Sequence, residues 1–72
     1  MSTLAEALPK EMARVRELIP LYESIGPAGS FAVAMMKADL DRAASALAVG
    51  DIVETVRVYE SLKGYTAREA TP

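Results

Sequence analysis

Cysteine, histidine and tryptophan are all absent from this sequence of 72 residues. Without cysteine or histidine, the chain has no ligands for a zinc finger or an iron–sulfur cluster, no thiol chemistry and no imidazole general base. An excess of positive charge is also lacking, since 8 basic and 10 acidic residues give a formal net charge of -2. Nucleic-acid-binding modules are usually strongly basic, so we expect no nucleic-acid partner.

A long hydrophobic run is missing as well. No stretch reaches the 18 or more apolar residues that a membrane-spanning helix requires, so we expect no membrane partner. The opening residues, Met1–Glu6, have neither the basic nor the apolar region of a secretion signal. Together these absences predict a cytoplasmic protein.

The chain is instead rich in alanine. Of its 37 apolar residues 13 are alanine, which leaves 24 larger ones to build a core. That number suffices for one small domain, in the size range where a single core supplies about 3–5 kcal/mol. Oligomerisation is therefore a route by which such a chain gains stability.

Three segments show the apolar spacing that is typical of helices, and none shows the alternation of a strand. We therefore predict an all-α fold, a small three-helix bundle within residues 1–63, with helices at about 4–25, 28–48 and 52–63. Residues 64–72 lose the periodicity and are expected to form a flexible C-terminal tail. Because the core is small, we expect an oligomer, with a homodimer as the leading form.

The first helix is expected to be long and to bend at proline. Thr3 and Glu6 have the spacing of a capping box, which marks its start. Pro9 could end a short opening turn, whereas Pro20 lies well inside the helix and predicts a kink. One kinked helix and two separate helices therefore both remain open. The large apolar residues of this segment fall on one stripe, namely Leu4, Leu8, Met12, Val15, Ile19 and Tyr22.

Glycine marks both turns between the helices. Gly26 is expected to close the first helix in a left-handed conformation, and Pro27 suits the first position of the second helix. Gly50 closes the second helix, and Asp51 caps the third, with Glu54 placed to reach back to the cap. One face of the third helix is expected to carry the apolar residues Ile52, Val56, Tyr59 and Leu62.

No set of side chains in the sequence identifies a reaction. Asp39 and Asp41, two residues apart, point about 200 degrees away from each other on a helix and cannot form one catalytic pair. Lys37 and Asp41, four residues apart, are expected to form a surface ion pair, as are Arg57 and Glu60 at a spacing of three. The serines have no histidine to activate them, and no loop resembles a calcium site. We therefore predict a non-enzymatic protein without catalytic residues, metal ligands or cofactors.

The segment Ile25–Phe31, between the first two helices, is the most unusual in the chain. A helix N-terminus presents free amides that bind phosphates or carboxylates. The lysine of a P-loop is missing, however, and a tight turn in which Gly29 allows close packing accounts for the same residues. A structural turn, a protein contact and an anion site all stay open. The residues that would hold a small anionic ligand are Gly26, Gly29, Ser30, Lys37 and Arg14.

The second helix has more apolar residues than one face can use. Its contribution to an internal core needs only Val33, Met36, Leu40, Ala43 and Leu47. Either the helix is sandwiched between the other two, or its spare face meets a second chain. The residues expected at such an interface are Phe31, Met35 and Met36, with Tyr22 and Tyr59 at its edge.

The turns and the end of the third helix carry a resemblance to a known group. With Ile25-Gly26-Pro27-Ala28-Gly29, Gly50-Asp51 and Tyr59-Glu60-Ser61-Leu62-Lys63, the chain resembles short helical proteins of unknown function that bacteriophages and prophages encode. The similarity covers roughly residues 4–64. It implies no catalytic residue, but it implies a setting, that of a small accessory gene product that binds or inhibits a host component.

Two functions of different classes follow. The first is a protein-binding module that self-associates through the second helix and binds a host protein, as a phage-type accessory or counter-defence protein. The alternative is sequestration of a small anionic ligand, such as a nucleotide signal, at the start of the second helix. The apolar surplus of the second helix favours the first.

Overall fold

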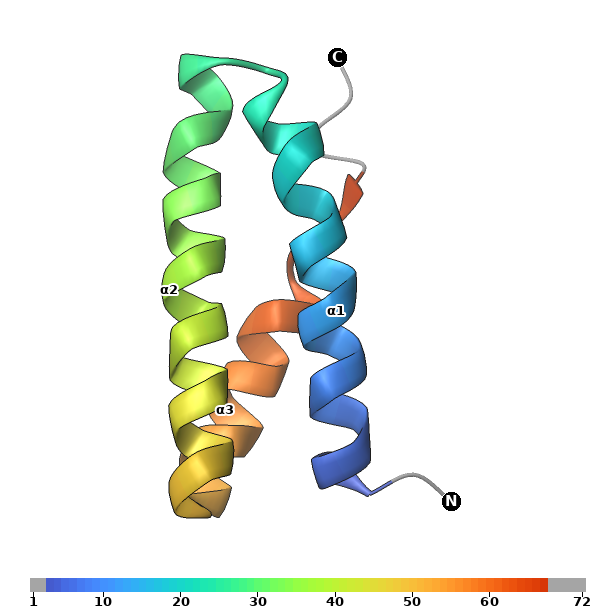
Figure 1. Cartoon of the computed structure of the whole chain (residues 1–72), viewed down its shortest axis with the longest axis vertical. Helices are drawn as coiled ribbons and strands as arrows, with labels where there is room; N and C mark the ends of the chain where they lie inside the picture. The colour runs from blue at the N-terminus through green and yellow to red at the C-terminus, as the bar shows by residue number, and fades with distance from the viewer. Residues whose placement is uncertain (1–2, 68–72) are drawn as a thin grey trace.

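The computed structural model describes residues 3–67, which form three helices: α1 (Leu4–Glu23), α2 (Pro27–Val49) and α3 (Ile52–Lys63). Each helix contacts the other two, with α1 and α2 antiparallel and α3 crossing behind them (Figure 1). No strand occurs in this range. The predicted all-α three-helix bundle is therefore confirmed.

The helix ends follow from local side-chain caps. The Thr3 side chain accepts a 3.2 Å hydrogen bond from the Glu6 amide at the start of α1, and Asp51 accepts one of 3.0 Å from Glu54 at the start of α3. Gly50 ends α2 in the left-handed conformation, with φ of 70°. Gly26 differs from the expectation: its φ of 89° and ψ of -145° make it the N-cap of α2, not a left-handed cap of α1.

Helix α1 runs without interruption through both of its prolines. Pro9 and Pro20 each remove one backbone donor, from the carbonyls of Ala5 and Arg16. All four residues are exposed, so the carbonyls that lose their donors lie on the solvent side of the helix. Of the two alternatives that the sequence left open, the structure shows one helix and not two.

The core runs along the centre of the bundle, between the three helices. It consists of Leu8, Met12, Val15, Leu18 and Tyr22 from α1, Val33, Met36, Leu40 and Ala43 from α2, and Val58 and Leu62 from α3. At about 0.8 kcal/mol for each buried methylene group, these side chains supply the main force for folding. Of the stripe predicted for α1, Leu4 and Ile19 are only half-buried, and Leu18 is buried in addition.

The face predicted for α3 is wrong in its first half. Ile52 and Val56 are 75% and 45% exposed, and Thr55 and Val58 are buried in their place. Burial of Thr55 is possible because its hydroxyl donates a 2.6 Å hydrogen bond to the carbonyl of Asp51. The carbonyl of Asp51, the residue that caps α3, therefore satisfies the hydroxyl of Thr55 on the buried face of the helix.

The three helices differ in length. The 12 residues of α3 span about 18 Å, whereas the 23 residues of α2 span about 34 Å. Residues 64–67, which follow α3, continue alongside α1 (Figure 1). None of the helices within residues 3–67 is both long and apolar enough to cross a membrane.

Candidate functional site

Helix α2 presents an unusually apolar surface to solvent. We call this surface the outer α2 face, and its exposed residues are Phe31, Ala34, Met35, Lys37, Ala38, Asp41, Ser45 and Val49. Phe31 is 74% exposed, Met35 47% and Val49 77%. Contact of α2 with both neighbours does not cover these side chains. Sandwiching of α2 between the other helices therefore does not account for its apolar surplus.

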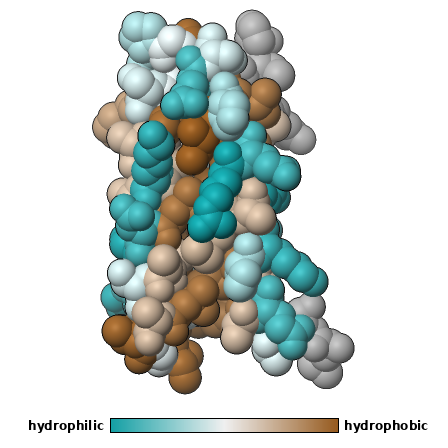
Figure 2. Space-filling view, viewed as in Figure 1, coloured by the Kyte–Doolittle hydropathy of each residue, from teal (hydrophilic) through white to brown (hydrophobic). Residues whose placement is uncertain are grey.

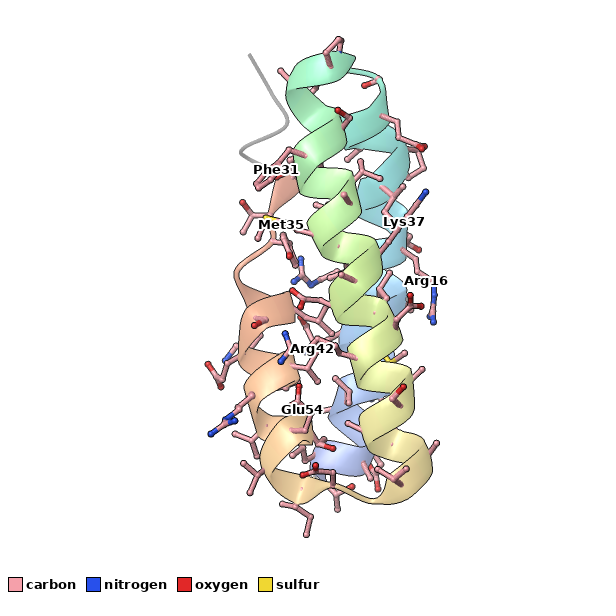
Figure 3. The ribbon with its side chains drawn as sticks, turned by 90° about the vertical axis from the view of Figure 1, so that its left-hand side faces the viewer. Arg16, Phe31, Met35, Lys37, Arg42 and Glu54 are labelled. Atoms are coloured by element: carbon pink, nitrogen blue, oxygen red, sulfur yellow. The ribbon has the colours of Figure 1, made fainter. Side chains whose placement is uncertain are left out.

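Figure 3 looks onto the outer α2 face and shows its two flanks. Phe31, Met35 and Arg42 point toward the α3 side, and Lys37 points toward the α1 side, next to Arg16. Arg42 is fixed on its flank by hydrogen bonds to Asp39 and Glu54. Phe31 and Met35 thus lie on the α3 flank together with the paired Arg42, and Lys37 lies on the opposite flank.

Two residues expected at the interface lie inside the molecule. Met36 is completely buried, because its position between Val33 and Leu40 on the helix places it on the stripe that faces α1. Tyr22 is only 4% exposed and belongs to the core. Tyr59 is half-buried, with the Lys63 ammonium 5.4 Å from the centre of its ring. Of the expected interface set, only Phe31 and Met35 lie on the outer α2 face.

A groove opens beside Phe31, at the level where α3 has ended. Its volume is about 370 Å³, and it is lined by Tyr22, Phe31, Ala32, Met35, Asp39, Ser61, Gly64 and Tyr65. Tyr65, from the segment that follows α3, lines the groove next to Gly64. The groove therefore combines an apolar rim with one carboxylate.

That carboxylate, Asp39, is the centre of a polar network. It accepts hydrogen bonds of 2.8 Å from the Tyr65 hydroxyl and 2.9 Å from Arg42, and Arg42 also donates to Glu54 at 2.8 Å. The hydrogen bond to Glu54, more than that to Asp39, raises the pKa of Arg42. Burial, followed by the hydrogen bond and charge of Asp39, raises the pKa of Tyr65 to about 12.

A tyrosine with a pKa near 12 stays neutral at physiological pH and acts here as a hydrogen-bond donor. The network therefore positions Tyr65 and satisfies Asp39. Sequence reasoning missed this network, because residues 39 and 65 have no local spacing in common. The available signal was an aspartate three residues after Met36, on the buried stripe of α2.

A second set of contacts holds the segment that follows α3. Arg14 donates hydrogen bonds of 2.8 Å to the carbonyls of both Leu62 and Tyr65, and it pairs with Glu11. The Tyr22 hydroxyl donates a 2.6 Å hydrogen bond to the carbonyl of Thr66. The described part of the expected tail, residues 64–67, thus includes two residues tied to α1, and residues 68–72 lie outside the described part of the chain.

The five residues considered for an anionic ligand are not brought together. Gly29 is buried, and a Cβ placed on it would lie 1.9 Å from the carbonyl oxygen of Tyr22, so it serves close helix packing. The Gly29 amide donates to the carbonyl of Gly26, and Ser30 donates to that of Pro27. Arg14 is engaged with the carbonyls of Leu62 and Tyr65, and Lys37 points outward about two turns beyond Ser30 on α2.

The charge pairs also differ from those expected. Neither Lys37 with Asp41 nor Arg57 with Glu60 forms an ion pair within residues 3–67, where Arg14 and Arg42 hold the pairs instead. Asp39 is buried and Asp41 exposed, as their spacing predicted. In the same range, no group of three or more acidic residues is placed to hold a metal ion.

A further apolar surface lies at the opposite end of the bundle from the groove. Figure 2 shows it as brown atoms at the lower end, where α2 ends and α3 begins. The exposed residues there are Leu47, Val49, Ile52, Val53 and Val56. Val49 belongs both to this end and to the outer α2 face.

Comparison with known proteins identifies no relative: no family model, no curated protein and no solved structure matches the chain.

Proposed function

We propose that this protein is a small helical protein-binding module that acts by association and not by catalysis, with the outer α2 face as its binding surface. The observation that carries the proposal is the 74% exposure of Phe31 beside the half-exposed Met35. Large apolar side chains that gather on one surface of a small protein typically mark a site of protein contact. Aromatic residues and methionine are also enriched at the centres of protein interfaces.

The polar groups support the same proposal. The most buried carboxylate, Asp39, is satisfied by Tyr65 and Arg42, and the five candidate anion-binding residues are dispersed. Association in the cytoplasm, as a phage-type accessory or counter-defence protein that binds a host component, is the concrete form that we propose. It rests on the resemblance of the turns around Gly26 and Gly50.

The test is affinity capture with matched surface variants. A tagged chain and an untagged copy of it are expressed together in the organism that encodes the protein. The cells are lysed, the tagged chain is captured, and the proteins retained with it are identified by mass spectrometry. Phe31→Ser removes the most exposed side chain of the outer α2 face, and Val53→Ser removes an exposed apolar side chain of α3 as the control.

We expect the parent and Val53→Ser to retain the same protein or untagged copy, and Phe31→Ser to lose it. Because Phe31 is exposed, its replacement should change the free energy of unfolding by less than about 0.5 kcal/mol. The proposal would be contradicted if the parent and both variants retained the same proteins, or if the parent retained none.

A further inference from the structure

We infer that the outer α2 face is covered by a second copy of this chain, with the two α2 helices antiparallel about a two-fold axis beside residues 39–40. This inference rests on the proposed function, since it names the occupant of the same face. It is carried by how the apolar, small and charged residues are distributed along α2.

The middle of the outer α2 face is made of small side chains. Ala34, Ala38 and Ser45 are exposed and lie within about 60 degrees of one another around the helix. Side chains of this size allow two helix axes to approach to about 8 Å, the close end of the usual range. A helix can therefore pack along this face.

Larger side chains occur on the two flanks of that strip. Phe31 and Val49 are 18 residues apart, which is five turns, so they lie on the same flank, toward α3. Lys37 and Asp41 are one turn apart on the opposite flank, toward α1. The α3 flank thus carries the apolar pair Phe31 and Val49, and the α1 flank carries the oppositely charged pair Lys37 and Asp41.

An antiparallel two-fold arrangement matches each flank with itself in reverse order. Phe31 then lies opposite the partner's Val49, Lys37 opposite the partner's Asp41, and Ala34 opposite the partner's Ser45. The midpoints of these three pairs, at residue 40, residue 39 and between the two, agree to within one residue, or about 1.5 Å along the helix. One axis therefore satisfies all three pairings.

Charge complementarity points to a second copy in this orientation. Lys37 and Asp41 are both exposed, and neither forms an ion pair within residues 3–67. The antiparallel dimer pairs each lysine with the partner's aspartate, twice by symmetry. A parallel dimer would instead match unlike flanks, so that Lys37 and Asp41 would lie opposite apolar side chains without an ion-pair partner, which disfavours it.

The size of the face sets the expected strength. A strip about 27 Å long, from Phe31 to Val49, and about 10 Å wide has a footprint of about 270 Å², smaller than the about 800 Å² per partner of a standard interface. We therefore expect a reversible dimer with a dissociation constant in the micromolar range. Measurements should extend to several hundred micromolar chain.

Disulfide cross-linking tests the register, and the absence of native cysteine makes single-cysteine variants unambiguous. Ala34→Cys and Ser45→Cys are mixed and mildly oxidised, and the products are separated by mass. We expect the mixed disulfide in at least fivefold excess over either symmetric product. The control is Ala13→Cys, an exposed alanine of α1. A dominant Ala34→Cys symmetric product, or cross-linking no faster than the control, would overturn the register.

Sedimentation velocity tests the charge pairing. Lys37→Glu and Asp41→Lys should each weaken the dimer about fivefold, and the double variant should restore the affinity of the parent. Arg57→Glu, a charge reversal at an exposed residue of α3, should leave it unchanged. Equal affinities for all four variants would overturn the pairing.

The outcomes separate this inference from the proposed function. A parent chain that stays monomeric at several hundred micromolar would exclude a second copy as the occupant. If that monomer still captured another protein through Phe31, the proposed function would stand and the inference would fail. A dimer that is insensitive to Phe31→Ser would overturn the inference, and the proposed function would then be decided by whether capture of another protein depends on Phe31.

Discussion

The hydroxyl of Tyr65 donates a 2.8 Å hydrogen bond to Oδ2 of Asp39, across 26 residues of sequence. This contact places the segment after α3 against α2, in the space that the short third helix leaves open. Asp39 is 9% exposed, so the hydrogen bond also satisfies a charge that would otherwise be costly to bury. The stabilities of Tyr65 and Asp39 variants, and the response of the fold to alkaline pH, are expected to depend on this hydrogen bond.

Tyr65 and Asp39 should be energetically coupled. Tyr65→Phe should lower the free energy of unfolding by about 1.5 kcal/mol, the typical contribution of a hydrogen bond to a charged group. Asp39→Ala should cost more, since it also leaves Arg42 without one acceptor. Urea unfolding of the two variants and the double variant should give a coupling of about 1 kcal/mol. Strict additivity would show that the contact contributes nothing.

The raised pKa of Tyr65, about 12 in the folded chain, predicts a dependence of stability on alkaline pH. In the unfolded chain a tyrosine ionises near pH 10. Because the fold favours the protonated form, its contribution is fully present below pH 10 and is lost as the pH rises from 10 to 12. Over that range, the free energy of unfolding should fall more steeply for the parent than for Tyr65→Phe. Parallel curves would contradict the assignment.

Arg14 should stabilise the end of α3, because it donates to the carbonyls of Leu62 and Tyr65. Arg14→Lys should lower the free energy of unfolding by about 1–2 kcal/mol, since one ammonium cannot reproduce the geometry of a guanidinium that bonds two carbonyls. Arg16→Lys is the matched control, because Arg16 is exposed and forms no ion pair within residues 3–67. Thermal unfolding should separate the two variants, and equal midpoints would refute the role of Arg14.

Gly29 should resist replacement although it lies inside a helix. Glycine-to-alanine changes in helices usually stabilise by up to about 1 kcal/mol. Here the added Cβ would meet the Tyr22 carbonyl oxygen, so Gly29→Ala should instead destabilise by about 1–3 kcal/mol. Ser30→Ala, at the next and exposed position, should change stability by less than about 0.5 kcal/mol. A stabilising Gly29→Ala would show that α1 and α2 do not pack this closely.

Two adjacent methionines should behave differently. Met36 is fully buried and Met35 is 47% exposed. Met36→Ala should cost about 2–5 kcal/mol, enough to unfold much of a chain with so small a core. Met35→Ala should cost less than about 0.5 kcal/mol. Circular dichroism during thermal unfolding measures both, and similar losses would place both residues in the core.

The helices themselves could be predicted from the sequence, because their boundaries depend on local chemistry. Thr3 and Asp51 cap the first amides of α1 and α3, and Gly50 takes the left-handed conformation that ends α2. Each signal acts over three or four residues, so it can be recognised without knowledge of the fold. The surplus of apolar residues on α2 was also visible in the sequence, whereas the exposure of Phe31 was one of two alternatives that the sequence left open.

The rotation of each helix about its axis, and the contacts between the helices, depend on packing. The apolar residues of α3 allow more than one buried face, and packing selects Thr55 and Val58 over Ile52 and Val56. Asp39 and Tyr65 meet because the segment after α3 packs against α2, and a contact across 26 residues of sequence has no local signature. Local signals in the sequence thus define the three helices and the apolar surplus of the second one. Packing determined which apolar residues stay exposed, because burial depends on neighbours that are distant along the chain.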